Sequence, residues 1–502
     1  ASSSADADVS LTAADALVLS KDITLTGANA QLALGYGSSY TLANGARITL
    51  SGASSSLEID GTGYTLIRSL DDLQTLMNGN LAGSFALASS IDAGATASWN
   101  GCEGFVPVNG FSGTFAGLGH FIDGLTINRP NQSVQGLFGL MSGTARDVTL
   151  SNVSVSGNGT VGSIAARLSG GLLTNVHVTG SVTAQSDLAG GLVGWSDIGT
   201  ISLSSAHVTV SGAGGVGGLV GRNRAATISD SYSTGSVTGT GSGLGGLIGT
   251  TVQGTTLTNV YASGLVTGGT DAGGLIGSQD ATAITVTNGY WDTGTTGQST
   301  SAGGTGISTA NAYTQATYSG FDFTNTWVMF AGDTRPMLRN EYSSVIATPV
   351  ALQLMALDLA ASYTLGANIN MAAAQATGGI WGASGFRPVG GNGSEFTGSF
   401  NGNGHTISGL MINRTGLNYA GLFGFTTGAT ISNVTLSGGS VVANSNVGAL
   451  IGYMSGGSVS SSASSMTVTA VSTAESNAGG LIGTIDGGAV SLSSTSGNVT
   501  GA

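Results

Sequence analysis

Side chains that could carry out chemistry are scarce in this sequence. The 502 residues include four histidines and one cysteine, and charged residues make up only 7% of the chain. His120 and His405 occupy equivalent places in two similar segments, but no second histidine, cysteine or group of carboxylates accompanies either. Metal ligation and acid–base catalysis need such companions. We therefore expect each ring to pack on Phe115 or Phe400 and to bond to the backbone.

One small group of charged residues could serve a polysaccharide lyase, hydrolase or epimerase. Enzymes of these classes also occur among parallel β-helices. Such an enzyme needs two or three carboxylates, or a carboxylate with Arg or Lys, close together. Arg222, Arg224 and Asp230 are near one another, and the repeat described below places Asp197 one coil before Arg224. We prefer to interpret Asp197 and Arg224 as a solvated pair at a turn. No P-loop, HExxH or GxSxG motif occurs, so the sequence predicts no catalytic, cofactor-binding or metal-binding residue.

Hydroxyl-bearing residues are the remaining polar feature. They occupy alternate positions that are expected to face outward, at Ser181 and Thr183, Ser236 and Thr238, and Thr267. Flat columns of hydroxyl groups can bind glycans, ice or another copy of the same surface. The alternative, which we favour, is that these residues are simply good strand formers.

A repeating element must position all of these residues, because one short motif recurs along the chain. The motif is Gly-Gly-Leu-Val-Gly at 190–194, and its central apolar residue recurs every 27 or 28 positions. The recurring residues are Leu137, Ile164, Leu192, Leu219, Leu247 and Leu275. So regular a period is typical of stacked repeats that bury their apolar faces against one another. Each repeat holds three short strands, which predicts a right-handed parallel β-helix with these residues as one inward column.

Two further columns keep the same period. The first is expected to stack at a corner and to bond along the column through side-chain amides. Its members are Asp147, Asn175, Leu203, Asp230, Asn259 and Asn288. The second, two positions further on, is partly aromatic, so we expect stacking there. Its members are Thr149, His177, Ser205, Tyr232, Tyr261 and Tyr290.

Residues 1–63 follow a shorter repeat, in which apolar triplets recur at every eighth or ninth position. Three such steps make a coil of about 25 residues, so this part is predicted to form narrower coils of the same solenoid. Ser69 is a good N-cap for the apolar spacing that follows it, which predicts a short helix over 69–78. A second copy of that pattern predicts a helix over 349–357, and we expect no other helix.

A larger duplication divides the chain. Residues 345–424 repeat the pattern of residues 64–139, and the His405 segment repeats the His120 segment. Residues 292–312 are expected to form a loop, and the aromatic-rich residues 313–344 to dock on the solenoid flank. The predicted parts are narrow coils at 1–63, a first β-helix unit with its exit segment at 64–344, and a second, truncated unit at 345–502.

Composition limits the classes of function. The net charge is −13, with one lysine among 12 basic residues, and no basic stripe is evident in the sequence. Nucleic acid and anionic membranes are therefore poor partners. Cys102 stands alone, so no internal disulfide can form, and no apolar run reaches the roughly 18 residues that would predict a membrane span. The chain begins without a signal segment and ends in mid-pattern, which we interpret as a mature or excised fragment.

The motifs together resemble those of a known family. The Gly-Leu motif, with Tyr-Ser-Thr-Gly-Ser-Val-Thr-Gly at 232–239 and its counterpart at 261–268, resembles the GLUG repeat of bacterial surface proteins. The segments at 111–122 and 289–293 are similar to those that precede and follow such repeats. Proteins with this layout resemble filamentous-haemagglutinin-like exoproteins, many of which are exported by two-partner secretion.

The resemblance implies a secreted or bacterial cell-surface β-solenoid that needs no cofactor. We expect an adhesin or spacer segment of a larger protein, acting through an elongated, uncharged and repetitive surface. Its expected partners are a glycan or protein on a host or neighbouring cell, or another copy of itself, together with an outer-membrane secretion partner. The alternatives are a carbohydrate-active β-helix enzyme and a self-assembling filament subunit.

Overall fold

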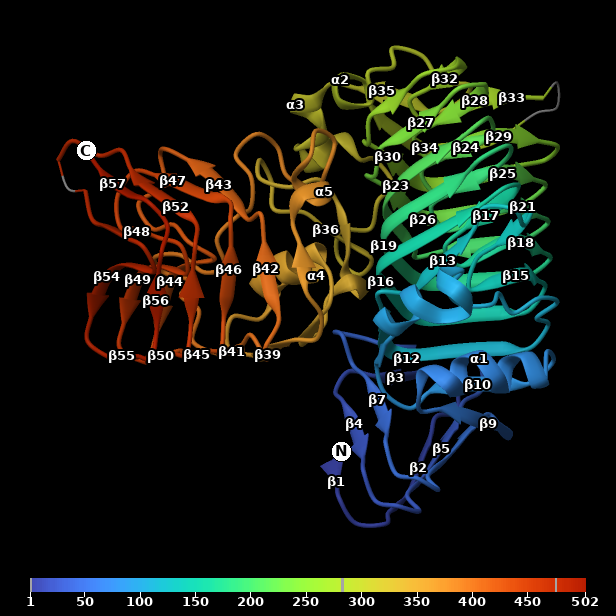
Figure 1. The fold of residues 1–502 in the computed structure, drawn as a ribbon, viewed down its shortest axis with the longest axis horizontal. Coiled ribbons are helices and arrows are strands. Elements are labelled where there is room, and N and C mark those ends of the chain that lie inside the picture. The colour runs from blue at the N-terminus through green and yellow to red at the C-terminus, as the bar shows by residue number, and fades with distance from the viewer. Residues whose placement is uncertain (1, 281–283, 475) are drawn as a thin grey trace. The chain divides into compact units, whose positions relative to one another are not determined.

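The fold is described by a computed structural model that covers residues 2–280, 284–474 and 476–502. The chain divides into two compact units, unit 1 (Ala1–Val328 and Leu338–Asn340) and unit 2 (Met329–Met337 and Glu341–Ala502). Strands make up 49% of the chain, helices are few, and the strands form a β-solenoid of about 17 turns. Figure 1 shows the strands stacked in parallel rows along each unit. The predicted all-β, parallel β-helix fold is confirmed.

The main solenoid of unit 1 stacks its strands in register, and each coil advances by one strand spacing, about 4.8 Å. One parallel sheet, which we call the β15–β33 sheet, contains β15 (Phe138–Met141), β18 (Ala165–Ser169), β21 (Val193–Asp197), β25 (Val220–Arg224), β29 (Ile248–Val252) and β33 (Ile276–Gln279). A second contains β14 (Val134–Gln135), β17 (Thr160–Gly162), β20 (Ala189–Gly190), β24 (Val216–Gly217), β28 (Ser242–Gly245) and β32 (Thr270–Gly273).

The remaining strands of these coils form two further rows, which the long strands β12 (Thr114–Asp123), β16 (Thr144–Gly157) and β19 (Leu172–Ala184) join around a corner. Later coils break at that corner into β22 (Thr200–Ser202), β23 (Ser205–Gly212), β26 (Thr227–Ser233), β27 (Val237–Gly239), β30 (Thr256–Ala262), β31 (Val266–Thr267) and β34 (Thr285–Asp292).

The Gly-Leu motif forms the predicted inward column. All six of its apolar side chains are fully buried, namely Leu137, Ile164, Leu192, Leu219, Leu247 and Leu275. The backbone N–H of Leu219 donates to the carbonyl of Leu247 at 2.9 Å, and that of Leu247 to Leu275 at 2.9 Å. A Cβ on Gly217 would lie 2.0 Å from the carbonyl oxygen of Val220. The glycine therefore recurs because the corner has no room for a side chain.

The corner column adopts left-handed backbone, with φ between 42° and 55°, at Asp147, Asn175, Leu203, Asp230, Asn259 and Asn288. Asn and Asp tolerate this region better than other residues with a Cβ. Asn259 Nδ2 donates to Asp230 Oδ1 at 3.1 Å, and Asn288 Nδ2 donates to Asn259 Oδ1 at 2.9 Å. The predicted amide ladder is therefore confirmed.

Leu203 interrupts this ladder, and a residue from the exit segment fills the gap. Asn340 Nδ2 donates to Asn175 Oδ1 at 2.7 Å and to the Leu203 carbonyl at 3.0 Å. The amide that Leu203 cannot supply therefore comes from a residue 137 positions later.

Aromatic residues join the exit segment of unit 1 to the same flank. The rings of Tyr232 and Tyr261 stack with centroids 4.8 Å apart and planes 13° apart. Trp327, in β36 (Trp327–Val328), packs against both rings at 5.8 and 6.1 Å. Its Nε1 donates to Asp230 Oδ1 at 3.2 Å. The predicted docking on the solenoid flank is thus confirmed for the part of the exit segment that belongs to unit 1.

The five apolar triplets of the N-terminal coils are strands, as predicted. They are β4 (Ile23–Leu25), β5 (Gln31–Gly35), β6 (Tyr40–Leu42), β7 (Ile48–Leu50) and β8 (Ser56–Ile59). They follow β1 (Ser2–Ser3), β2 (Asp8–Thr12) and β3 (Leu17–Leu19). Thr24 pairs in parallel with Thr49, which gives these coils the predicted length.

The winding does not continue unbroken into the main solenoid, which corrects the expectation that these are simply narrower coils of the same solenoid. β8 pairs antiparallel with β9 (Thr62–Ile67), and Leu57 lies opposite Tyr64. The two turn residues, Asp60 and Gly61, have φ of 49° and 72°. Two successive positive φ values define the tight hairpin turn for which Asp-Gly is preferred. Strands β10 (Ser84–Leu87) and β11 (Ile91–Asp92) then resume parallel pairing.

Both predicted helices are present. α1 (Leu70–Gly79) follows Ser69, whose Oγ accepts from the N–H of Asp72 at 3.0 Å. α4 (Pro349–Leu354) follows Thr348 in the same way and continues as a 3₁₀ turn over Met355–Leu357. No helix in the described residues is long and apolar enough to cross a membrane.

The prediction that no other helix occurs is wrong. Short helical segments also lie at η1 (Gly94–Cys102), α2 (Thr293–Thr296), α3 (Thr309–Ala312), η2 (Gln315–Thr317), η3 (Arg339–Glu341) and α5 (Ala372–Gln375). The segment 292–312, predicted as loop, holds two of them and β35 (Thr305–Ile307). Asp292 and Ser308 accept hydrogen bonds from the first turns of α2 and α3, so these helices depend on local caps.

Unit 2 repeats the architecture. Its strands include β39 (Ser362–Leu365), β41 (Ser399–Asn401), β45 (Thr430–Ser432), β50 (Ser458–Ser460) and β55 (Ala489–Ser491) in one sheet. Another sheet contains β43 (Met411–Arg414), β47 (Ser440–Ala443), β52 (Thr467–Ala470) and β57 (Val499–Gly501). A third contains β44 (Phe423–Thr427), β49 (Ile451–Ser455) and β54 (Ile482–Asp486). The predicted repeat centres Leu422, Leu450 and Leu481 are buried.

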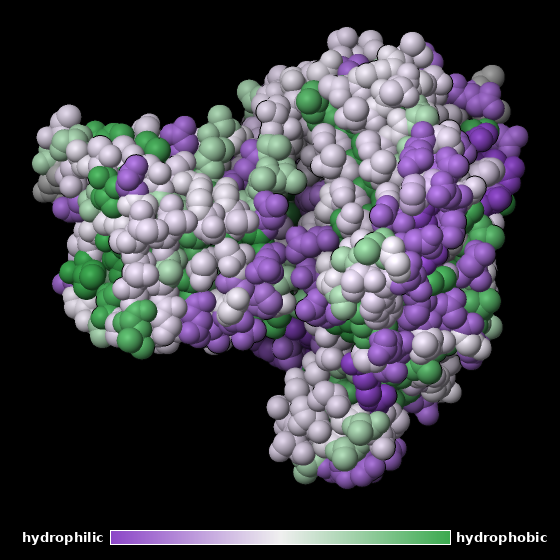
Figure 2. Space-filling view, in the orientation of Figure 1, coloured by the Kyte–Doolittle hydropathy of each residue, from purple (hydrophilic) through white to green (hydrophobic). Residues whose placement is uncertain are grey.

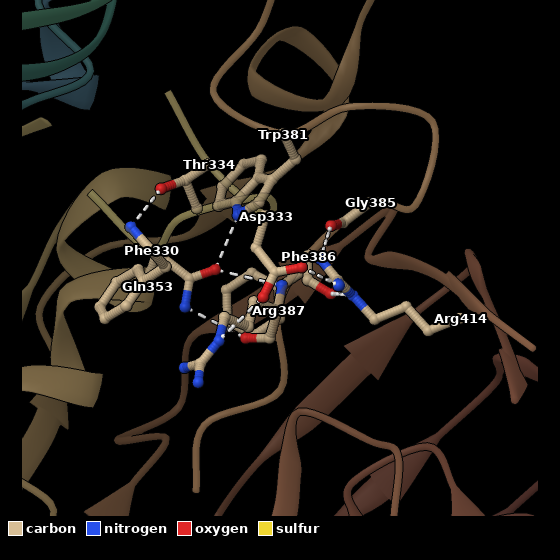
Figure 3. Close-up of polar contacts among 9 residues, drawn as sticks. All are labelled: Phe330, Asp333, Thr334, Gln353, Trp381, Gly385, Phe386, Arg387 and Arg414. Carbon is tan, nitrogen blue, oxygen red and sulfur yellow. Dashed lines mark hydrogen bonds and ion pairs between the residues drawn. The ribbon is translucent and has the colours of Figure 1, made fainter. Parts of the chain in front are cut away.

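Polar contacts fasten the first residues of unit 2 to its solenoid (Figure 3). The Asp333 carboxylate accepts from Arg387 Nε at 3.1 Å and from Arg414 Nη1. Arg414 also donates from Nη2 to the Gly385 carbonyl at 3.0 Å. Unit 1 contains a similar contact, in which Arg129 pairs with a carboxylate at 2.9 Å. The duplication therefore extends to this arginine, which is buried in unit 1 and half-buried in unit 2, although Asp333 comes from a different place in the chain.

Candidate functional site

The outward position that follows the Gly-Leu motif carries an arginine or a tryptophan on three successive coils of unit 1. Arg167 in β18 pairs with Trp195 in β21, which pairs with Arg222 in β25. Parallel register therefore stacks these three side chains on successive coils of the β15–β33 sheet. We call Arg167, Trp195 and Arg222 the Arg–Trp row. All three side chains are partly exposed.

The two guanidinium groups of the Arg–Trp row enclose the indole ring. Arg167 Cζ lies 4.2 Å from the Trp195 ring centroid, and Arg222 Cζ lies 5.1 Å from it. Since one arginine belongs to the preceding coil and the other to the following coil, they lie on opposite sides of the ring along the stack. Such cation–π contacts fix the orientation of otherwise flexible arginines.

Asp197 joins the Arg–Trp row to a third arginine. Its Oδ2 accepts from Arg167 Nη2 at 2.8 Å, and its Oδ1 accepts from Arg224 Nε at 2.7 Å. The predicted stacking of Asp197 and Arg224 is confirmed, but the expectation of a solvated pair is wrong for Asp197, whose side chain is buried. Asp230 is not part of this group, because its carboxylate bonds to Asn259 and Trp327 at the corner column.

The chemistry of this cluster suits charge recognition better than proton transfer. Hydrogen bonds from Arg224, and then from Arg167, lower the pKa of Asp197 below its usual value despite its burial. A carboxylate held ionised in this way is a poor proton donor near neutral pH. No group of three or more His, Cys, Asp or Glu side chains within the described ranges is placed to hold a metal ion.

The histidines have structural surroundings. His120 is buried, and its Nε2 donates to the Ile48 carbonyl at 2.9 Å, which confirms the expected backbone bond. Its Nδ1 lies 3.3 Å from Ser90 Oγ. Burial, together with the nearby Arg47 charge, lowers the pKa of His120 to about 3. The ring is therefore neutral at physiological pH and cannot act there as an acid.

His405 does not share this environment, although the duplication makes it the counterpart of His120. It is half-buried, and its backbone N–H donates to the Gly402 carbonyl at 2.8 Å. The difference arises because unit 1 includes the N-terminal coil that supplies Ile48. His177 bonds to Asn175 Oδ1 and Ser205 Oγ, both at 2.9 Å, so it lies among polar neighbours in the partly aromatic column.

The predicted hydroxyl columns do face outward. Thr183, Thr238 and Thr267 are exposed, while Ser181 and Ser236 are half-buried. Strand register places the exposed hydroxyls in one line that also includes Ser211, and we call this line the hydroxyl row (Thr183, Ser211, Thr238 and Thr267). Adjacent oxygens lie 3.0 Å apart for the first pair and 3.3 Å apart for the last pair. The row offers a regular set of weakly polar groups along the stack.

Unit 2 has aromatic residues at the position that corresponds to the Arg–Trp row. Phe425 in β44 pairs with Tyr453 in β49, and their ring centroids are 4.7 Å apart. Tyr419 packs against both rings at 5.4 and 5.8 Å. The residue after the Gly-Leu motif is thus outward in both units.

Sequence reasoning missed the Arg–Trp row and expected no basic stripe. The expectation needs correction, because coil register gathers Arg167, Arg222 and Arg224 on one sheet. Figure 2 shows a strongly hydrophilic band across the right-hand flank of unit 1, where β18, β21 and β25 are labelled in Figure 1, among paler and less polar residues. A signal was available, since each residue of the row lies three positions after a recurring apolar residue of the inward column.

Comparisons with known proteins agree with the repeat architecture. Residues 62–180 match the sequence model of the M26 IgA1-specific metallo-endopeptidase N-terminal region, and residues 212–238 match the GLUG motif. Halomucin from Haloquadratum walsbyi is 40% identical over 159 residues, which is 29% of this chain and 2% of halomucin. The chain thus spans a small fraction of that relative.

Two solved structures are also similar. One, described as a "putative immunoglobulin A1 protease" from Bacteroides ovatus, has a TM-score of 0.38 and 23% identity, covering 45% of this chain and 75% of that one. The other, an IgA1 protease, has a TM-score of 0.34 and 20% identity, covering 47% and 21%. Likenesses this distant do not bear on activity. The chain is a β-solenoid repeat protein that carries the GLUG motif.

Proposed function

We propose that this chain is an adhesin or spacer segment of a larger secreted or bacterial cell-surface protein, similar to filamentous-haemagglutinin-like exoproteins. It acts by presenting an elongated, repetitive and weakly charged surface. Its partners are a glycan or protein on a host or neighbouring cell, or another copy of itself. An outer-membrane partner exports it, and nucleic acid is not a ligand.

The hydroxyl row is the observation that carries this proposal. It repeats one polar group on four successive coils, so a ligand with a regular repeat meets the same contact several times. Multiple weak contacts of this kind raise the overall avidity without any deep pocket. The GLUG match and the likeness to halomucin support a surface location.

A carbohydrate-active enzyme is the second candidate, because Asp197 lies between Arg167 and Arg224 on adjacent coils. The lowered pKa of Asp197 weighs against it, since a glycosidase acid needs a raised pKa. We therefore assign no catalytic role to the cluster.

An adhesion assay tests the proposal. The purified full chain is immobilised, and attachment of bacterial and epithelial cells is counted with and without glycan-removing enzymes. We expect attachment by the wild type and a clear loss in a variant with Thr238→Asp and Thr267→Asp. A Thr26→Asp variant, which alters an exposed threonine outside the row, is the control. Equal attachment by all three proteins would count against the hydroxyl row.

A further inference from the structure

We propose that the Arg–Trp row, together with Arg224, binds a linear acidic polysaccharide through the carboxylate or sulfate groups of the sugar chain. The assignment rests on the proposed surface-binding function and names a ligand class for one part of that surface. It concerns a different row of side chains from the hydroxyl row, so the two can be tested separately.

The geometry of the arginines favours an anionic ligand. Both faces of the Trp195 indole are covered by guanidinium groups, at 4.2 and 5.1 Å from the ring centroid. A sugar therefore cannot stack on the ring, and the indole instead holds two planar cations apart. Guanidinium groups fixed in this way suit carboxylates and sulfates, which accept two parallel hydrogen bonds.

The balance of charge favours the same class of ligand. The cluster contains three arginines and one carboxylate. The carboxylate of Asp197 bonds to both Arg167 and Arg224. Arg222 has no ion-pair partner among the residues that the structure describes, and its contact is with the indole. The cluster therefore keeps an excess of two positive charges within a chain of net charge −13. An anionic ligand is attracted to this patch and repelled by the rest of the chain.

Three hydrogen-bond donors in the row lack acceptors. The Nε atoms of Arg167 and Arg222 and the Nε1 atom of Trp195 are buried, and none has a hydrogen-bond partner among the residues that the structure describes. Buried donors are normally satisfied, and an unsatisfied one costs stability. A small shift of these three partly exposed side chains would open the donors to anionic oxygens lying along the row.

The Arg–Trp row runs along the stack of coils, which favours a polymeric ligand. Arg167 and Arg222 are two coils apart, a separation of about 9.5 Å, comparable to a disaccharide repeat. The same outward position continues as Thr250 and Ser278, whose oxygens lie 3.2 Å apart. Acidic groups on alternate sugars would meet the arginines, and the hydroxyls would contact the next sugars. Nucleic acid, with a charge at every nucleotide, needs more cations than the row supplies.

Binding of the full chain to defined polysaccharides tests the proposal. The probes carry one acidic group on alternate sugars: hyaluronate for carboxylates and κ-carrageenan for sulfates, with unmodified dextran as the neutral control, at low salt. We expect wild-type binding to at least one acidic probe and none to dextran. Losing a charged hydrogen bond in Arg222→Gln should weaken that binding at least about tenfold. Lys21→Gln, which removes a positive charge elsewhere, should leave it unchanged.

Two further variants separate the effect of paired guanidinium hydrogen bonds from the effect of positive charge. Arg222→Lys keeps the charge but cannot form two parallel bonds, so it should bind more weakly than the wild type. Trp195→Ala should also weaken binding, because both arginines lose their support, while circular dichroism shows the strands intact.

Each outcome decides the assignment. Binding by Arg222→Gln equal to that of the wild type, or equal loss in Lys21→Gln, would overturn it. Competition by double-stranded DNA at equal concentration would show a general polyanion site and would also overturn it. In any of these cases, attachment that still depends on the hydroxyl row would leave the proposed function standing. If cell attachment does not depend on the hydroxyl row but polysaccharide binding is intact, the proposed function fails and the assignment of the Arg–Trp row stands.

Discussion

The side chain of Leu219 lies fully buried in the inward column, between the coils of Leu192 and Leu247. We predict that Leu219→Ala lowers the free energy of unfolding by about 2–5 kcal/mol, because a cavity remains in a tightly packed column. In a stack that interacts mainly through nearest neighbours, the loss should fade with distance. Hydrogen exchange measured coil by coil checks this. A uniform rise in exchange along unit 1 would contradict it.

His120 makes the stability of unit 1 depend on pH. Its pKa is lowered from 6.5 to about 3, so the unfolded chain binds this proton more readily than the folded chain. Stability is therefore full above pH 6.5 and falls as the pH drops towards 3. At pH 5 the loss should be about 2 kcal/mol.

The measurement for His120 is the urea midpoint at pH 7.5 and pH 5. We expect the wild type to lose more stability between these pH values than His120→Gln does. His405→Gln is the matched control, and it should keep the wild-type difference. The same pH dependence in His120→Gln and in the wild type would refute the assignment to His120.

At the level of single residues, the sequence period was enough to place Asp197 beside Arg224, because the two residues lie one coil apart in the repeat. It did not reveal Arg167 and Trp195 as their neighbours, because the residue type at the position after the motif changes from coil to coil. One partner of Asp230, Asn259, follows from the corner column, but the other partner could not be predicted. Trp327 reaches it from 97 residues away, outside any period.

The hairpin between β8 and β9 is the element that reverses the chain in unit 1. Gly61 has φ of 72° and open space where a side chain would project, so any cost of a side chain there is backbone strain. We predict that Gly61→Ala destabilises the chain by about 1–2 kcal/mol. Gly63 also has open space but no positive φ, so Gly63→Ala is the control and should be near neutral. Chemical denaturation measures the free energy of unfolding of both variants. Equal values for Gly61→Ala and Gly63→Ala would contradict the turn assignment.

Elements were predictable where a period or a cap was visible. The inward column and the helix after Ser69 follow from spacing alone. The hairpin was missed although Asp60-Gly61 is a strong turn signal, because the shorter N-terminal period hid the reversal. The short helices after Asp292 and Ser308 were missed because their caps lie within a Gly- and Thr-rich segment that resembles a loop.

At the scale of the whole molecule, the duplication was evident in the sequence, but the contacts that fasten unit 2 were not. Residues 329–337 belong to unit 2, where Asp333 bonds to Arg387 and Arg414. Such contacts join segments 54 and 81 residues apart and follow no repeat. A period predicts what stacks within a solenoid, and it cannot predict where irregular segments attach.

Recovery of a bound polysaccharide tests the central claim most directly, namely that this solenoid binds through its surface and does not act as a catalyst. The full chain is incubated with acidic and neutral polysaccharides, and the ligands are recovered and analysed for chain length and new unsaturated ends. We predict bound ligand of unchanged length. Shortened ligand or new unsaturated ends, lost in Asp197→Asn with the fold intact, would contradict this prediction and favour the enzyme.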